Sequence, residues 1–227
     1  MASKQEIIVT AVKVLGYIEK VSSFASAFEP LFGIVTNVVG MFRKGLVGEE
    51  DHKLAQDFKQ INEKLETISE KNKQTLRQMR IDEVNETFGK YEEIIKHQYE
   101  AFNTMVERVK LEPDNSKKHI DEFVEIYKND RNDMSLKVYY DGVTHQESVF
   151  GRPLLEVYLE HCNRDRRVME ARCSHIVHLF YIGLITLMAY TLVTESDEEE
   201  MREKWKKRVV EIQAKMQEAL DQCEQGN

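Results

Sequence analysis

The sequence predicts an all-α protein, an elongated bundle of long antiparallel helices around one very apolar central helix. Only 10 glycines and 3 prolines occur in 227 residues, so few positions break a helix or form a turn. Apolar residues recur at alternating steps of four and three over most of the chain, which is the period of one helix face. The stretch 176–194 contains no Asp, Glu, Lys or Arg. The scarcity of turns argues against β-sandwiches and doubly wound sheets.

Residues 4–28 are predicted to form the first amphipathic helix. Its apolar residues follow one another at steps of four and three: Ile7, Ala11, Val14, Ile18, Val21, Ala25 and Phe28. Such a heptad seam is typical of a helix that packs against another helix. Pro30 then ends or kinks this helix.

The next stretch, 31–47, carries no charge as far as Phe42 and includes Gly33 and Gly40. Small residues in an apolar stretch suit close helix packing or a lipid environment. The stretch is short for a membrane span. Two interpretations therefore stay open: a buried core helix and a membrane-seeking segment.

Residues 49–110 contain no proline and are predicted to form one long helix or two nearly collinear ones. At a rise of 1.5 Å per residue, an unbroken helix of this length would span roughly 93 Å. The apolar seam shifts phase near 80–84 and then resumes as far as Val109. The molecule is therefore either a rod, or it bends at the phase break or at Gly89.

A shorter helix is predicted over 116–130. Pro113 ends the preceding helix, and Asp114 or Asn115 can cap the new one. Residues 134–152 are the least helical part and are predicted to form an irregular connector.

A β-hairpin is the alternative for this connector. Asp141-Gly142 lies between two β-leaning runs, which is a hairpin signal. Two strands alone are marginal in water, so the connector is favoured.

Two further helices flank the most apolar segment. One begins at Arg152-Pro153, with the proline in its first turn, and 163–167 either interrupts it or forms its polar turn. The apolar helix covers about 174–194. The acidic run 195–200 supplies a cap and a favourable charge for the last helix. That helix carries Met201, Trp205, Val209, Ile212, Met216, Leu220 and Cys223.

The chain, 1–227, is interpreted as a single helical domain with two candidate membrane-competent segments. At 1.5 Å per residue, 176–194 reaches roughly 28 Å, close to the hydrocarbon thickness of a bilayer. It suits either a bilayer span or the buried central helix of a soluble bundle that releases it at a membrane. The candidate residues are Leu31, Phe32, Ile34, Val35, Val38, Val39, Met41, Phe42, Ile176, Val177, Leu179, Phe180, Tyr181, Ile182, Leu184, Ile185, Leu187, Met188, Tyr190, Leu192 and Val193.

No catalytic or cofactor-binding constellation is evident. The chain has no GxSxG elbow, Walker loop or GxGxxG motif, so no enzymatic activity, cofactor or small-molecule substrate is expected. Cys173, His175 and His178 form the best metal candidate, but a regular helix separates Cys173 and His178 by about 140°. No metal site is therefore predicted. A net charge of −8 argues against nucleic-acid binding.

The three cysteines, Cys162, Cys173 and Cys223, suit no disulfide framework, so reduced thiols are expected. Charged residues such as Glu6 and Lys13 interrupt the first apolar residues, and no cleavage site is clear. A cytoplasmic location, with membrane association, is therefore expected.

Four long runs of the sequence resemble the rapunzel family of bony fishes. They read VLGYIEKVSSFASAFEPLFGIV, KLETISEKNKQTLRQMRIDEVNETFGKYEEIIKHQYEAFNTMV, FGRPLLEVYLEHC and VMEARCSHIVHLFYIGLITLMAYT. The resemblance covers almost the whole chain and is weakest over 110–150. It implies a setting in fin and skeletal growth and, as for some members, in innate immune regulation. It also implies a more distant similarity to the helical region of cephalotoxin-like proteins, and it brings no enzymatic residues.

Two functional hypotheses follow. The first is a non-enzymatic helical protein that acts at membranes, by insertion or pore-like assembly. The second is a soluble, coiled-coil-like scaffold or regulator that binds protein partners through its helix seams. The candidate partners are accordingly a lipid membrane, a second copy of the chain or another helical protein.

Overall fold

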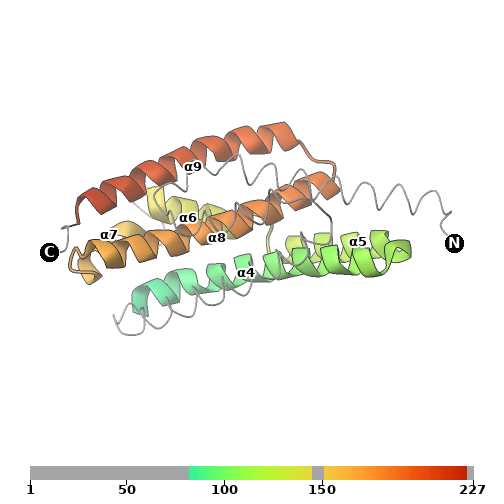
Figure 1. The fold of residues 1–227 in the computed structure, drawn as a ribbon, viewed down its shortest axis with the longest axis horizontal. Coiled ribbons are helices and arrows are strands. Elements are labelled where there is room, and N and C mark those ends of the chain that lie inside the picture. The colour runs from blue at the N-terminus through green and yellow to red at the C-terminus, as the bar shows by residue number, and fades with distance from the viewer. Residues whose placement is uncertain (1–81, 145–150, 224–227) are drawn as a thin grey trace.

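The computed structural model describes residues 82–144 and 151–223, and within them the chain is helical without a β-strand. This confirms the all-α fold class. The predicted helix over 4–28, the apolar stretch 31–47 and the 49–81 part of the long helix lie outside the described residues. The elements are α4 (Asp82–Leu111), η2 (Pro113–Asn115), α5 (Ser116–Asn129), α6 (Met134–Thr144), α7 (Leu154–His161), α8 (Arg166–Val193) and α9 (Glu198–Asp221) (Figure 1).

The helix α4 runs through Gly89 as a single helix. Its buried residues keep the predicted steps of four and three: Val84, Phe88, Tyr91, Ile95, Gln98, Phe102, Met105 and Val109. The one polar member, Gln98, is 2% exposed and donates from Nε2 to the Asn132 carbonyl at 2.8 Å. The buried amide therefore keeps a hydrogen-bond partner, as a polar group in a core requires.

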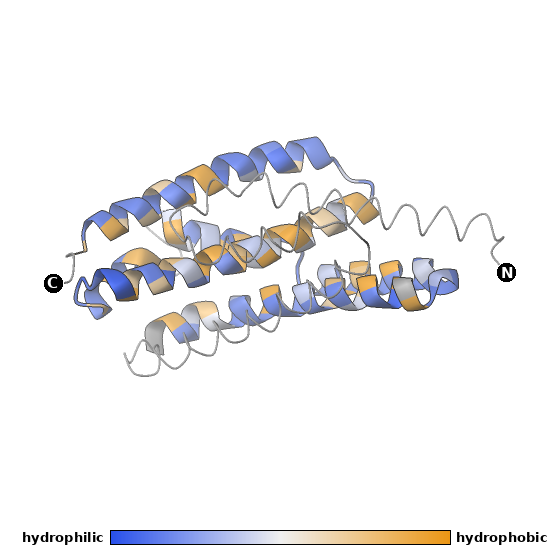
Figure 2. Cartoon of the chain, viewed as in Figure 1, coloured by the Kyte–Doolittle hydropathy of each residue, from blue (hydrophilic) through white to orange (hydrophobic). Residues whose placement is uncertain are grey.

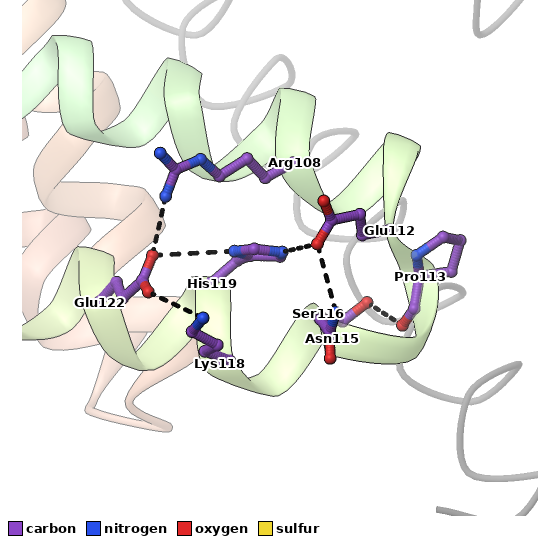
Figure 3. A network of polar contacts seen from close by, with 8 residues as sticks. All are labelled: Arg108, Glu112, Pro113, Asn115, Ser116, Lys118, His119 and Glu122. Atoms are coloured by element: carbon purple, nitrogen blue, oxygen red, sulfur yellow. Dashed lines mark hydrogen bonds and ion pairs between the residues drawn. The ribbon is translucent and has the colours of Figure 1, made fainter.

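The turn between α4 and α5 is held by a network of charged and polar side chains (Figure 3). His119 lies between two carboxylates, 3.3 Å from Glu112 and 3.7 Å from Glu122. Glu122 also contacts Arg108 at 3.0 Å across the helix pair. Asn115 occupies the N-cap position but its side chain donates to Glu112 instead of capping α5. Side chains from both helices therefore fasten this end of the hairpin.

The helix α6 corrects the expectation of an irregular connector or a hairpin for the 134–144 part of 134–152, and residues 145–150 lie outside the described residues. Asp141-Gly142 lies inside this helix, not at a turn between strands. A Cβ built on Gly142 would lie 2.6 Å from the Phe88 ring, so the glycine permits close packing of α6 on α4. Ser135, Leu136, Val138, Tyr139, Gly142 and Val143 are the buried residues, and their spacing follows a helix face. Tertiary packing has overridden the β propensity of this segment.

The turns on both sides of α8 are tight and capped. Asn163 and Arg164 have positive φ angles of 50° and 58°, and residues 162–165 separate α7 from α8. The predicted interruption over 163–167 is therefore shorter, because Arg166 and Arg167 already belong to α8. The Asp165 carboxylate then accepts hydrogen bonds from the backbone of the first turn of α8. After α8, Asp197 caps α9 by accepting from the Glu200 amide at 2.9 Å, as the acidic run predicted.

The helix α8 contacts each of the other described α-helices, α4, α5, α6, α7 and α9. Figure 1 shows it passing lengthwise between α9 and α4, with α5 beside α4. Hydropathy colouring shows α9 as largely hydrophilic, whereas α8 is apolar over its second half (Figure 2). Within the described residues, α8 therefore has other helices on several of its sides.

Candidate functional site

The candidate site is α8, the helix that contains the second predicted membrane-competent segment. An 18-residue window of it has a mean hydropathy of 2.0, and 83% of that window is buried inside the protein. It is the one described helix long and apolar enough to cross a membrane, a property that the core helix of a soluble protein shares. The observation identifies a membrane-competent segment by length and composition alone.

The candidate residues of 176–193 are placed almost entirely in the core. Val177, Tyr190 and Val193 are partly buried. Ile176, Leu179, Phe180, Tyr181, Ile182, Leu184, Ile185, Leu187, Met188 and Leu192 are buried. The other candidates, Leu31, Phe32, Ile34, Val35, Val38, Val39, Met41 and Phe42, lie outside the described residues.

Two threonine hydroxyls in the apolar half of α8 are hydrogen-bonded within the helix itself. Thr186 donates to the Ile182 carbonyl and Thr191 donates to the Leu187 carbonyl, each at 2.8 Å. Since helical backbone groups also pair within their own segment, this half would lose few hydrogen bonds on leaving its neighbours. The same property makes such a helix acceptable in a protein core and in hydrocarbon.

Close contacts pack α8 against its neighbours. A Cβ on Gly183 would lie 2.4 Å from Cδ2 of Leu136 in α6, so the two helices meet at the glycine. Tyr190 stacks on Tyr127 of α5 with ring centroids 4.4 Å apart, and Phe180 lies 6.3 Å from the Trp205 ring of α9. Aromatic pairs of this kind add about 0.5–1.5 kcal/mol each beyond their buried area.

A polar cluster lies where α8 meets α4. His175 Nε2 is 3.2 Å from a Glu92 carboxylate oxygen, and Lys96 is 2.7 Å from the other. Burial alone would raise the pKa of Glu92, but the hydrogen bond and charge of His175, together with Lys96, outweigh it and lower the pKa to about 2. Glu92 is therefore an anion held in a mostly enclosed position.

His178 lies one turn further along α8 and is 5% exposed. Burial, reinforced by the charges of His175 and Lys96, lowers the pKa of His178 to about 3 against the opposing effect of Glu92. His178 is accordingly neutral in the closed bundle. Within the described ranges, no group of three or more His, Cys, Asp or Glu is placed to hold a metal ion.

Two features of this region were missed by sequence reasoning. The Glu92–His175 contact joins residues 83 positions apart, and such a separation leaves no trace in local spacing. The available signal was the pair of histidines inside an otherwise apolar helix. Arg172 is 2% exposed and lies over the Tyr158 ring at 5.6 Å, whereas sequence alone would place an arginine at the surface.

The comparisons with known proteins agree with this helical architecture. A family model described as the cephalotoxin-like middle helical domain matches residues 48–226. Protein rapunzel from Danio rerio is 34% identical over 212 residues, which cover 93% of this chain and 92% of the relative. No solved structure matches. The expected resemblance is thus confirmed, and the chain belongs to the rapunzel family, with a cephalotoxin-like middle helical domain over 48–226.

Proposed function

We propose that this protein acts at membranes without enzymatic chemistry, and that α8 is the segment that leaves the bundle and enters the bilayer. The observation that supports this is the enclosure of a membrane-length apolar helix by the other described helices, of which α9 is largely hydrophilic (Figure 2). A helix that is apolar on most of its faces must be surrounded, either by protein or by lipid. The closed bundle is then a water-soluble form, which we place in the cytoplasm.

The two halves of α8 suit an inserted state. Its 28 residues would extend roughly 42 Å, more than the ~30 Å of hydrocarbon in a bilayer. Arg166, Arg167 and Arg172 lie in the first turns, where basic side chains can stay with the headgroups while the apolar half enters the bilayer. The Thr186 and Thr191 hydroxyls keep their intrahelical hydrogen bonds when the helix enters the bilayer.

The family supports the proposal in part. The matched domain is described as cephalotoxin-like, which suggests a toxin-like mode of action such as pore-like assembly from several copies of the chain. The apolar stretch 31–47 would be a second inserting segment. The biological setting that we propose, fin and skeletal growth and innate immune regulation, is the one that the family resemblance implies.

A soluble scaffold is the alternative, and less supports it. Among the described residues, the large hydrophobic side chains classed as exposed are Leu111 and Val210, at 82% and 53%. Two separate side chains make no apolar face for a partner helix. A scaffold role would therefore rely on the seam of 4–28, outside the described residues.

The test is protection of α8 from protease on vesicles. The full chain is mixed with liposomes of phosphatidylcholine and phosphatidylserine, floated on a density gradient and digested with proteinase K. We expect a membrane-protected fragment that contains 176–193 and is absent when detergent is added first. Failure to float, or flotation with α8 cleaved as fast as α9, would contradict the proposal.

A further inference from the structure

The fold gathers the three cysteines at one end of the bundle. Cys162 follows α7, Cys173 lies in the first half of α8 and Cys223 follows the end of α9. All three are buried free thiols. The helices α7, α8 and α9 contact one another, and the Cys162 and Cys223 thiols donate within their own segments, to the Leu159 and Ala219 carbonyls, each at 3.5 Å. Residues far apart in sequence thus form a thiol cluster.

An arginine fastens the two segments that carry Cys162 and Cys223. Arg166, at the start of α8, donates from Nη1 to the Leu220 carbonyl at 3.2 Å and from Nε to Glu170 at 3.0 Å. The first bond joins the α7–α8 turn directly to the last turn of α9. The segments that carry the two thiols are therefore held side by side.

We propose that Cys162 and Cys223 are a redox pair that closes to a disulfide in the presence of a disulfide oxidant such as glutathione disulfide, leaving Cys173 as a thiol. The fold favours this pair because Cys162 and Cys223 lie just beyond the ends of α7 and α9, in segments that the Arg166–Leu220 hydrogen bond joins, whereas Cys173 lies inside α8.

The exchange balances with one molecule of oxidant. The Cys223 thiol loses its proton, and the thiolate sulfur attacks one sulfur of glutathione disulfide, which expels one glutathione thiolate. The Cys162 thiolate then attacks the Cys223 sulfur of the mixed disulfide and expels the second glutathione. Two protein thiols are oxidised, one disulfide is reduced to two thiols, and the two protons go to the departing thiolates.

Cys173 is protected from this exchange by its position. It has no exposed surface, and burial raises the pKa of its thiol to about 12, so almost no thiolate is present at neutral pH. Cys223 is 8% exposed at a helix end, where chains fray. Burial also raises the pKa of Cys223, but Arg166 and Arg164 oppose that rise. Cys223 is the most exposed of the three thiols, against 4% for Cys162, so we place the first attack there.

Closure of the pair would fasten α9 over α8. The bond joins positions 162 and 223, a separation of 223 − 162 = 61 residues that includes all of α8 and α9. A cross-link of this kind restricts the open form more than the closed one. If α8 leaves the bundle as proposed above, the oxidised protein keeps α8 inside the bundle. This consequence, unlike the pairing itself, rests on the proposed function.

The test is disulfide mapping of the full chain after incubation with excess glutathione disulfide. The protein is unfolded in the presence of N-ethylmaleimide, digested and analysed by mass spectrometry. We expect the free thiols to fall from three to one, a Cys162–Cys223 peptide pair, and alkylated Cys173. The matched Cys173→Ser variant should lose both of its thiols, whereas Cys162→Ser and Cys223→Ser should form no internal disulfide.

Oxidation in guanidinium chloride is the folding control, and it should give all three pairings. A native linkage that contains Cys173, or three thiols that remain free or carry only glutathione, would overturn the redox pair. A second assay compares oxidised and reduced protein on the same liposomes, where several-fold less protected α8 is expected after oxidation. If oxidised and reduced protein gave equal amounts of protected α8, the redox pair would still hold, but its effect on membrane entry would be contradicted.

Discussion

At the scale of single residues, two glycines show how differently the same residue type is used. A Cβ on Gly183 would meet Cγ and Cδ2 of Leu136 at 2.9 and 2.4 Å, and Leu136 is 2% exposed, so it has little room to move. A Cβ on Gly89 would meet nothing within 4 Å. Gly183 is therefore required by packing between α8 and α6, whereas Gly89 only weakens the helix that contains it.

We expect Gly183→Ala and Gly89→Ala to change stability in opposite directions. Overpacking should make Gly183→Ala less stable by about 1–3 kcal/mol. Gly89→Ala should be more stable by up to about 1 kcal/mol through helix propensity. Urea unfolding measures both, and Leu136→Ala should cost less in the Gly183→Ala background than in the parent, because the two residues are in contact. Equal effects at the two glycines would show that α6 and α8 do not meet as described.

Other residue-scale features could be predicted only in part. The acidic cap of α9 and the buried seam of α4 follow from local spacing, and the structure places them accordingly. The Glu92–His175 pair and the thiol cluster depend on which helices become neighbours. Periodicity predicts which face of a helix is buried but not which other element covers that face. These contacts could therefore not be predicted from the sequence.

At the scale of elements, α6 shows where local propensity misleads. Its Val and Tyr residues and its Asp-Gly pair favour strands and a turn when taken alone. In the fold, Tyr139 packs 5.3 Å from the Phe88 ring and Gly142 approaches the same ring. By contrast, α8 was predictable because a long uncharged stretch has few alternatives to a buried or membrane helix.

The burial of α8 predicts a large difference between two leucine substitutions. Leu184 is 3% exposed near the middle of α8, whereas Leu111 is 82% exposed at the end of α4. Leu184→Asp should cost about 3–5 kcal/mol, because it places an unpaired carboxylate in the core. Leu111→Asp should stay within about 0.5 kcal/mol of the parent. Thermal unfolding followed by circular dichroism would compare them, and a harmless Leu184→Asp would mean that α8 is not enclosed.

A helix cap offers a milder test at the same scale. The Asp165 carboxylate accepts from the Arg167 and Val168 amides, at 2.8 and 3.3 Å, at the start of α8. Asp165→Ala should cost about 1 kcal/mol, and Asp165→Asn should retain most of the parent stability. Guanidinium titrations of the three proteins would measure this. Equal losses for Ala and Asn would argue that the cap contributes through charge alone.

At the scale of the whole molecule, the polar cluster around α8 makes the closed bundle sensitive to acid. His178 faces His175 on its own helix and Glu92 and Lys96 on α4. The pKa of His178 is about 3 in the bundle, whereas its ordinary value is 6.5. Between pH 3 and pH 6.5 this histidine therefore binds a proton in the unfolded chain but not in the folded chain. Glu92 acts in the same direction between 4.5 and about 2. Stability is therefore complete above pH 6.5 and falls as the pH decreases.

We expect the free energy of unfolding to drop by about 2 kcal/mol between pH 8 and pH 5 through His178. Urea titrations across this range measure the drop. The His178→Leu variant removes the titrating group, so its stability should change much less over the same interval. An equally steep decline in His178→Leu would assign the acid sensitivity to other groups. The liposome assay should also give more protected α8 at pH 5 than at pH 8.

The position of Trp205 gives the natural protein an optical reporter of these events. It is the only tryptophan in the chain, it has no exposed surface, and its ring lies on α9 against Phe180 of α8. Arg208 lies 4.8 Å above the same indole, where a cation alters the energy of the excited state. Because Tyr140 of α6 also lies 6.3 Å from this ring, the emission reports whether α9 stays packed on α8 and α6: it is red-shifted if α9 lifts into water and blue if α9 stays closed. Every step that separates α9 from these two helices can be timed by stopped-flow mixing, with no dye and no engineered residue.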